Sequence, residues 1–392
     1  MERAEVLKGI IEKLHSGSTV EEVKEEFKKH FENVSSEEIA DAERLLMSQG
    51  TSVEEIQSLC DVHATLFEGS VIQPESEYKL GHPLEVFKAE NEGIKNFIES
   101  KLLVSLSAFR SDNSNKASLL ADLKSLSKID KHYSRKENLL FPYLERAHIS
   151  APPKVMWGVD DEIRELIKKS ISSVENDNSD AINLIEETLE QVFSMIKKEN
   201  EILSPMLIEV MNEEDWKVVA SESPQIGYVF TGGIEGASPS DAHAWSEDED
   251  AKVESRNDDP IQLPSGFFKN NELTALLNTL PCDVTFVGAD DKVHFFSEQE
   301  NRVFPRTRTI IGRDVANCHP PKSLEAVEKL VEAFKDGSKD SESYWISKGD
   351  LFILIRYFAV RDVDGTYLGV LECTEEISEL RSLEGNKTLM SE

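Results

Sequence analysis

The sequence predicts a multidomain α plus α+β protein: a small N-terminal helical domain, a four-helix bundle and a C-terminal antiparallel sheet with helices. Three observations support this fold class. A chain of 392 residues is too long for one ordinary core of roughly 100–150 residues. Residues 82–212 contain four long amphipathic segments. From Leu263 onward the pattern changes to short apolar alternations that are typical of strands.

The composition indicates a globular protein outside the membrane. Hydrophobic residues make up 39% of the chain and charged residues 30%. No apolar run approaches the ~20 residues that cross a bilayer, and the first residues lack the apolar core of a secretory signal. The four cysteines are widely spread and form no Cys-x-x-Cys pair, so we expect reduced thiols and a cytoplasmic location.

The charge balance excludes several classes of partner. The chain has 75 acidic and 43 basic residues, a formal net charge of −32. Such a charge repels phosphate backbones and anionic headgroups, so we expect no direct binding to nucleic acid or membranes.

Residues 1–72 predict a small helical domain of unknown function. Three Ser-x-x-Glu capping boxes, which begin at Ser18, Ser35 and Ser52, mark helix starts. Cys60 and His63 lie one turn apart on an apolar helix face. They are either half of a metal site or a buried hydrogen-bonded pair, and the sequence leaves both readings open.

Residues 80–215 predict the antiparallel bundle. The first helix opens at Pro83, with His82 just before it, and the third begins after Pro152 and Pro153. Each apolar stripe is interrupted near its middle by polar residues: Asn91, then His132, Lys136 and Glu137, then Asp160, and finally Glu199. Burying such groups without partners costs roughly 2–7 kcal/mol each, so we expect them to meet one another, a metal, a cofactor or water.

The remaining chain divides into a linker and an α+β domain. Residues 231–262 are acidic and rich in Gly, Ser and Pro, which predicts a linker. Residues 263–385 predict two strands joined by a hairpin, a helix from Pro321 to the stop at Gly337, three further strands and a short exit helix. Strand order of this kind is that of a PAS domain.

Several segments together resemble one protein group. They are LCDVHATLF, GHPLEVFKAEN, HYSRKENLLFPYLE, PPKVMWGVDDEIR, LPCDVTFV, GRDVANCHPPKS and YFAVRDVDGTYLGVLE. The group joins domain of unknown function four-three-eight to a hemerythrin-like (HHE cation-binding) bundle and a C-terminal PAS domain. The resemblance implies oxygen, iron or nitric-oxide chemistry in the bundle and signal reception in the PAS domain.

The match to the ligand pattern of a hemerythrin-like bundle is partial. His132 stands at the second-helix histidine, but Lys136 takes the acid position four residues later, and Glu137 follows it. Elsewhere the histidine positions hold other residues, while the fourth-helix acid is kept: Asn91, Asp160 and Met195 replace histidines, and Glu199 matches the acid. An ammonium among these ligands would repel metal ions, so a standard di-iron centre is not expected.

Four readings of the bundle site remain open. In the first, Lys136 pairs with Glu199 or Asp160, and its positive charge takes the place of a metal ion. Lys136 is then a candidate regulatory residue. In the second, a single metal such as iron is bound by His132, Glu137, Glu199 and Asp160. A haem or other cofactor ligated by His82 or His132, with Met195 as second axial ligand, is the third. An intact di-iron site is the fourth.

The C-terminal domain offers two further candidates in the segment CHPPKS. His319 either binds haem or a polar ligand in the pocket or bonds to the Pro-Pro turn that follows. Cys318 is a candidate regulatory thiol, provided that its pKa is lowered. Trp345, Arg356 and Tyr357 alternate on strands and either flank the cavity or pack within the sheet.

These observations predict an intracellular sensor. The bundle and the PAS domain would detect a small molecule or metal, and the output would pass to an unidentified protein partner. An enzyme is less favoured, since the sequence has no catalytic triad, no glycine-rich phosphate loop and no kinase or DNA-binding module after the PAS segment. The alternatives are iron-dependent handling of oxygen or nitric oxide, and an apo-bundle interaction scaffold. A homodimer is compatible with each.

Overall fold

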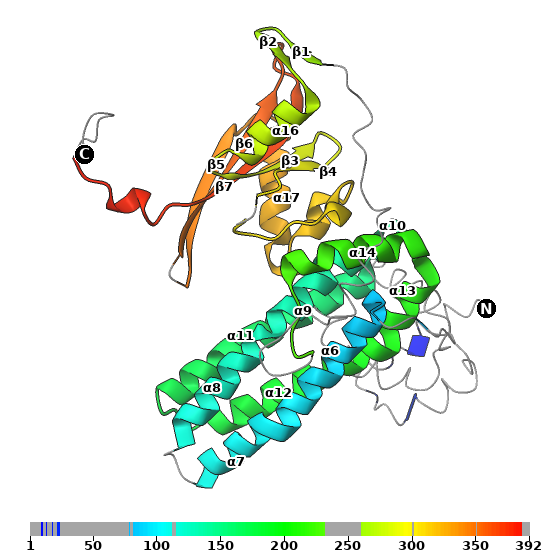
Figure 1. The fold of residues 1–392 in the computed structure, drawn as a ribbon, viewed down its shortest axis with the longest axis vertical. Coiled ribbons are helices and arrows are strands. Elements are labelled where there is room, and N and C mark those ends of the chain that lie inside the picture. The colour runs from blue at the N-terminus through cyan, green and yellow to red at the C-terminus, as the bar shows by residue number, and fades with distance from the viewer. Residues whose placement is uncertain are drawn as a thin grey trace. The chain divides into compact units, whose positions relative to one another are not determined.

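The computed structural model describes residues 9, 10, 13, 18, 22, 23, 78, 81–111, 115–231, 260–299, 302–349 and 351–385 (Figure 1). The predicted helical domain at 1–72, with Cys60 and His63, therefore lies outside the described residues apart from isolated positions. Most of the predicted linker does too. The chain forms two compact units, one helical and one built around a sheet. The predicted combination of an α-helical bundle with an α+β domain is confirmed.

The helical unit is built from the amphipathic segments that the sequence predicts. Its helices are α6 (Pro83–Phe97), α7 (Leu103–Ser111), α8 (Lys116–Leu126), α9 (Asp130–Arg135), α10 (Phe141–Arg146), α11 (Ala151–Glu175), α12 (Ala181–Lys198), α13 (Ser204–Val210) and α14 (Glu213–Ile226). α11 begins at Ala151, so that both prolines lie in its first turn. Apolar residues from α6 to α14 form one continuous core.

Three of the bundle segments are interrupted by π-helical turns. These are Ile98–Leu102, Lys136–Leu140 and Glu199–Leu203. A π-helical turn inserts one extra residue and changes which side chains face the core, and such turns are frequent at functional sites. The second and third begin at Lys136 and Glu199, the residues that interrupt the apolar stripes of their helices.

α14 was not predicted. Its sequence signal is local, because Asn212 and Asp215 form a capping box at its start. After α14 the chain turns at Gly227 and runs back along α6. We call residues 227–231 the return segment.

The second unit is an antiparallel sheet with strand order β4-β3-β7-β6-β5. Its strands are β3 (Asp283–Gly288), β4 (Val293–Phe296), β5 (Ser341–Lys348), β6 (Leu351–Arg361) and β7 (Tyr367–Glu376). The helix α17 (Pro321–Lys335) packs against the sheet through Leu330, Val331 and Phe334. The hairpin, the helix from Pro321 and the three final strands are all found where the sequence predicts them.

Three details of this unit differ from the prediction. The hairpin β1 (Ile261–Leu263) and β2 (Gly266–Phe268) begins inside the predicted linker, because the two strands pair with each other. The helix α16 (Asn270–Asn278) was not predicted. The predicted exit helix is wrong: β7 stays paired with β6 through Glu376, which leaves only a 3₁₀ turn at Leu380–Ser382.

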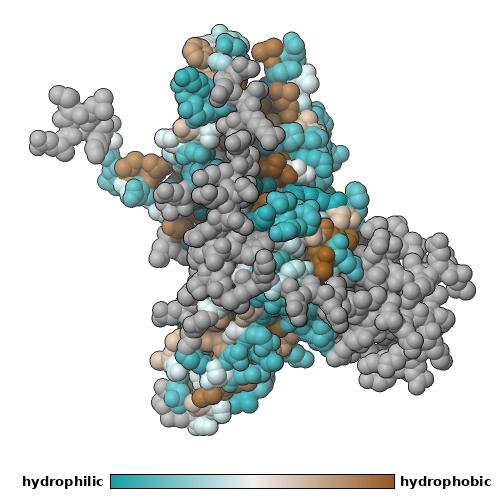
Figure 2. Space-filling model, turned by 45° about the vertical axis from the view of Figure 1, so that its right-hand side comes forward, coloured by the Kyte–Doolittle hydropathy of each residue, from teal (hydrophilic) through white to brown (hydrophobic). Residues whose placement is uncertain are grey.

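The described surface is hydrophilic over much of the face drawn in Figure 2, in keeping with the net charge of −32. Among the described helices, none is long and apolar enough to span a bilayer.

Candidate functional site

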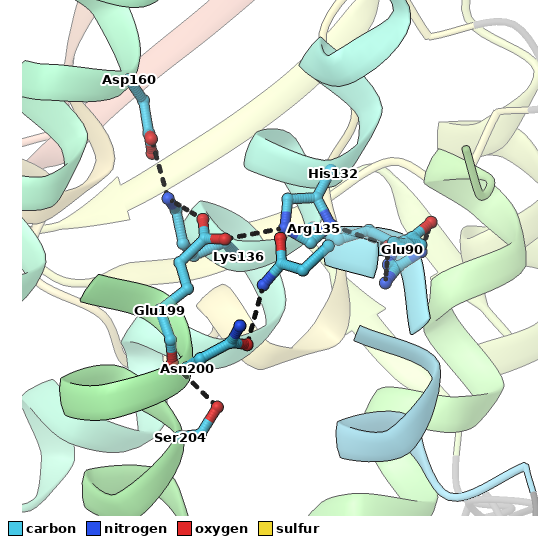
Figure 3. A network of polar contacts seen from close by, with 9 residues as sticks. Glu90, His132, Arg135, Lys136, Asp160, Glu199, Asn200 and Ser204 are labelled. Atoms are coloured by element: carbon cyan, nitrogen blue, oxygen red, sulfur yellow. Dashed lines mark hydrogen bonds and ion pairs between the residues drawn. The ribbon is translucent and has the colours of Figure 1, made fainter. Parts of the chain in front are cut away.

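A cluster of charged side chains is buried in the middle of the bundle (Figure 3). It is supplied by α6, by the segment from α9 into the π-helical turn that follows, by α11, and by the turn after α12. We call it the core ion network. Its members are Glu90, His132, Arg135, Lys136, Asp160 and Glu199. Each is at most 4% exposed, so its charges interact in a medium that screens them far less than water does.

Lys136 connects two acids across the bundle. Its Nζ lies 2.7 Å from Asp160 Oδ1 and 2.5 Å from Glu199 Oε1. The ammonium also lies 4.5 Å from the centre of the Tyr133 ring. The first sequence reading has Lys136 pair with Glu199 or Asp160, and the structure places its ammonium against both.

His132 contacts a carboxylate through each ring nitrogen. Nδ1 lies 2.8 Å from Glu90 Oε2 and Nε2 lies 3.1 Å from Glu199 Oε2. The ring stacks on Phe87, with the centroids 4.0 Å apart. Because a carboxylate accepts hydrogen bonds, both nitrogens must donate, and the ring is then an imidazolium cation. The pKa agrees: burial alone would lower it, but Glu199 and Glu90 outweigh burial and raise it.

Glu90 joins the network to the return segment. Its carboxylate accepts two bonds of 2.8 Å from Arg135, and its Oε1 accepts the Val229 N–H at 2.7 Å. Gly93, one turn further along α6, permits this approach, because a Cβ there would lie 2.0 Å from the Phe230 carbonyl oxygen. The Arg135 guanidinium also lies 4.6 Å from the Tyr228 ring centre. Hydrogen bonds and a cation–π contact therefore join the core ion network to the return segment.

The charges of the core ion network balance without a further cation. Burial alone would raise the pKa of Glu199, but Lys136 and His132 outweigh it and hold the pKa at about 2. Burial likewise raises the pKa of Asp160, to about 6 even beside Lys136, so this acid is mostly ionised at neutral pH. Glu90, Asp160 and Glu199 are thus matched by Arg135, Lys136 and His132.

These residues do not fit a metal ion. A ligating histidine must be neutral with one free ring nitrogen, whereas both nitrogens of His132 face carboxylates. Lys136 holds a positive charge where Asp160 and Glu199 converge. Within the part of the chain that the structure describes, no three His, Cys, Asp or Glu side chains are grouped as a metal site. The imidazole-rich donor set of a di-iron centre is missing as well, because Asn91, Asp160 and Met195 stand at the other histidine positions. The side-chain amide of Asn91 donates to Asn200 Oδ1 at 3.1 Å.

Two other candidate ligands, Glu137 and Met195, have different contacts. Glu137 forms a two-point ion pair with Arg164 of α11, at 2.7 and 3.1 Å. Lys136 follows His132 by four residues and therefore lies on the same helix face. Glu137 follows His132 by five residues and is rotated away from that face. Met195 is fully buried in the apolar core. Glu137 therefore does not join His132, Asp160 and Glu199 as the single-metal reading requires.

His82 caps α6. Its Nδ1 accepts the Leu84 N–H at 3.2 Å, and its ring stacks on Tyr78 with the centroids 3.9 Å apart. The adjoining cavity, lined by Gly81, Arg135, Tyr228 and residues of α6, α14 and the π-helical turn after α9, has a volume of about 10 Å³. A cavity of this size holds about one water molecule, so it does not fit a haem ligated by His82.

The cap predicts a pH dependence. Burial, and then the nearby Lys88, lower the pKa of His82 from 6.5 to about 4. Because the unfolded chain then binds the proton more tightly, His82 contributes stability above pH 6.5, and this is lost as the pH falls toward 4. His82→Asn keeps a capping acceptor that does not titrate. Between pH 7 and pH 4, the free energy of unfolding of the bundle should fall less in this variant than in the wild type, by up to about 3 kcal/mol. Amide hydrogen exchange in α6 measures this difference. Parallel pH profiles would contradict the assignment.

The C-terminal unit contains a much larger cavity, of about 380 Å³. Pockets of about 300–1,000 Å³ with an apolar lining and a few polar groups are typical of small-molecule sites. His319 and Tyr357 line this cavity, which is one of the two alternatives that the sequence leaves open for each of them. Trp345 is instead 63% exposed, and Arg356 pairs with Glu375 at 3.2 Å. Cys318 is not among the residues that line the cavity, and its thiol donates to the Asp314 carbonyl at 3.5 Å.

Sequence reasoning missed several residues of both sites. Glu90 carried a signal, because it lies three residues after Phe87 and four before Ile94 on the buried face of α6. Tyr344 and Glu372 line the cavity from β5 and β7. Arg135 and Arg164 gave no comparable signal, since their buried partners lie on other helices.

Three family models match successive parts of the chain. Residues 7–73 match a family of unknown function (DUF438), residues 82–207 match the hemerythrin HHE cation binding domain, and residues 273–378 match a PAS domain. This is the domain arrangement that the sequence predicts. No curated protein matches the chain.

Solved structures resemble parts of the chain. A C-terminal domain from Streptococcus mutans is 32% identical, and the match covers 32% of this chain and 98% of that one, with a TM-score of 0.31. A sensory box sensor histidine kinase from Vibrio cholerae is 16% identical over 27% of this chain and 90% of that one, with a TM-score of 0.22. The sensor region of a sensor histidine kinase is 13% identical, and the match covers 25% of this chain and 40% of that one, with a TM-score of 0.20.

Proposed function

Because the chain joins a DUF438 region, a hemerythrin HHE domain and a PAS domain in that order, we propose that it is a sensor whose PAS domain receives a small molecule. The combination of the HHE and PAS domains supports a sensory or signalling role. The cavity of about 380 Å³ in the PAS unit is the observation that carries the proposal. The cytoplasm is the proposed compartment.

The bundle supplies the responsive element in this proposal. Its core ion network connects α6, α9, α11 and the π-helical turns after α9 and α12 to the return segment, which directly precedes the acidic stretch before the PAS domain. A ligand shifts a conformational equilibrium only by binding one state more tightly than the other, so the responsive part must have two alternative arrangements. A hydrogen-bonded ion network that depends on each of its members is suited to this. The output would pass to a separate protein partner.

The second predicted function, iron-dependent handling of oxygen or nitric oxide, has less support. It requires metal ligands, and the described acids of the bundle core are already paired with Lys136, His132 and Arg135. An apo-bundle that acts through its own ion pairs agrees better with the geometry.

Native mass spectrometry of the full chain tests the receiving role. Ala326 lines the cavity from α17, and Ala326→Phe would fill part of it. We expect the wild-type chain to carry a small organic molecule that the Ala326→Phe chain lacks. Glu328→Gln, on an exposed face of the same helix, is the matched control and should keep the molecule. If wild-type and Ala326→Phe chains both have the mass of the bare polypeptide, the PAS cavity is not a receiving site.

A second measurement tests the signalling role. Partner proteins captured from a lysate by the wild-type chain should be exchanged or lost with Ala326→Phe, and kept with Glu328→Gln. The sensor assignment fails if the ligand is lost while both the captured proteins and the hydrogen exchange of the bundle stay unchanged.

A further inference from the structure

The PAS cavity results from a size gradient along α17. The residues of α17 that line the cavity recur at helical spacing: Ser323, Ala326, Val327, Leu330, Val331 and Phe334. Phe334 is 0% exposed and fills the C-terminal end of the interface. Ser323 and Ala326 are small, so that space remains at the N-terminal end of the helix, next to His319. The apolar part of any ligand would therefore lie against Ala326 and Val327.

One wall of the cavity is polar. Tyr344 and Tyr357 join β5 and β6 through a hydroxyl–hydroxyl bond of 3.0 Å. Tyr357 lies directly opposite Glu372 on β7, and burial together with this carboxylate raises the pKa of Tyr357, so its hydroxyl stays protonated. Tyr344 is 42% exposed, which places this wall toward solvent. The wall offers hydroxyl and carboxylate groups to a ligand.

The charges around the cavity disfavour charged ligands. Glu372 would repel an anion, and Arg306 lies 3.9 Å away in an ion pair with that carboxylate. A cationic ligand would meet the Arg306 guanidinium, which already pairs with Glu372. Burial lowers the pKa of His319 to about 4 although Glu372 pulls the other way. The imidazole is neutral at physiological pH and offers one donor and one acceptor.

We propose that the PAS cavity binds an uncharged, mainly apolar molecule of one or two rings whose hydroxyl group bonds at the wall formed by Tyr344, Tyr357, Glu372 and His319. The inference rests on the proposed receiving role of this cavity and specifies the chemistry of its ligand. Apolar residues of α17 and the sheet contact the rings, and a hydroxyl can both donate to Glu372 or His319 and accept from a tyrosine.

Isothermal titration of the full chain with four naphthalene probes tests the ligand class. The probes are 1-naphthol, naphthalene, 1-naphthoate and 1-naphthylmethylammonium. We expect 1-naphthol to bind at least about tenfold more tightly than either charged probe, since burying an unpaired charge costs more than burying a hydrogen-bonded hydroxyl. It should also bind about threefold to tenfold more tightly than naphthalene.

Two tyrosine variants locate the hydroxyl contact. Tyr357→Phe should remove most of the preference for 1-naphthol over naphthalene and leave the affinity for naphthalene unchanged. Tyr367→Phe is the control, because its hydroxyl has no hydrogen-bond partner among the described residues and it does not line the cavity. Both variants should keep the melting temperature of the wild type within a few degrees, so that a change in affinity reports the contact.

The outcomes separate this inference from the receiving role. Equal or tighter binding of a charged probe, blocked by Ala326→Phe, would overturn the uncharged class and leave the cavity as the receiving site. Loss of the 1-naphthol preference in Tyr367→Phe, or its survival in Tyr357→Phe, would overturn the polar wall. If no probe binds, the ligand class proposed here is wrong, and the mass measurement of the co-purified molecule still decides the receiving role by itself.

Discussion

Replacing Lys136 by methionine is expected to lower the free energy of unfolding of the bundle by about 3–5 kcal/mol, the typical cost of removing one partner of a buried ion pair. Methionine keeps much of the length of the side chain and removes the charge. Asp160 and Glu199, both 0% exposed, then lose the ammonium that lies 2.7 and 2.5 Å from them. Hydrogen exchange of the amides in α9 and α12 measures this loss in the bundle alone.

Lys131 is the matched control. It is exposed on the same helix as His132, so Lys131→Met should change the stability by less than about 0.5 kcal/mol. Adding Asp160→Asn to Lys136→Met should recover part of the loss, because the remaining Glu199 still pairs with His132. If Lys136→Met behaves like Lys131→Met, the ammonium does not compensate the buried acids.

The same variant has an expected pH dependence and metal dependence. Without Lys136 the buried acids take up protons at higher pH, so the stability deficit relative to wild type should shrink as the pH falls from 7 toward 5. Added Zn²⁺ should stabilise Lys136→Met more than the wild-type bundle, since a divalent cation can replace the missing charge only where the ammonium is absent. A larger stabilisation of the wild type by Zn²⁺ would show that Lys136 does not keep metals out.

Replacing Glu90 by glutamine is expected to destabilise the bundle by about 3 kcal/mol. Three groups donate to this carboxylate: the Arg135 guanidinium, His132 Nδ1 and the Val229 N–H. A glutamine offers one acceptor oxygen where the carboxylate offers two, and it leaves Arg135 and His132 with less counter-charge. The return segment should also detach more often, because it loses its bond to α6.

Hydrogen exchange at Val229 distinguishes this effect from a general loss of stability. In Glu90→Gln the Val229 amide should exchange faster by a larger factor than the core amides of α12. Glu92→Gln, an exposed neighbour on α6, should leave both rates unchanged. Uniform acceleration of all bundle amides would mean that Glu90 stabilises the bundle without fastening the return segment.

The helices and strands were largely predictable because their signals are local. The apolar periodicity and Pro83 placed the start of α6, and Pro321 with Gly337 placed α17. Errors occurred where tertiary pairing overrides a local pattern. The residues of the predicted exit helix include Glu375 and Glu376, which pair with β6 instead. The π-helical turns were also missed, since one extra residue leaves no clear mark on a helical stripe.

The sequence by itself determined that polar groups interrupt the apolar faces of the bundle, and that Lys136 stands where an acid was expected. The interruptions follow from the helical period, whereas the expected acid follows from the resemblance to a hemerythrin-like bundle. Only the tertiary structure decided how the charges pair. It gave His132 a carboxylate at each ring nitrogen, gave Lys136 both Asp160 and Glu199, and turned Glu137 toward Arg164. Pairing depends on which side chains of different helices meet, and spacing along one helix carries no information about that.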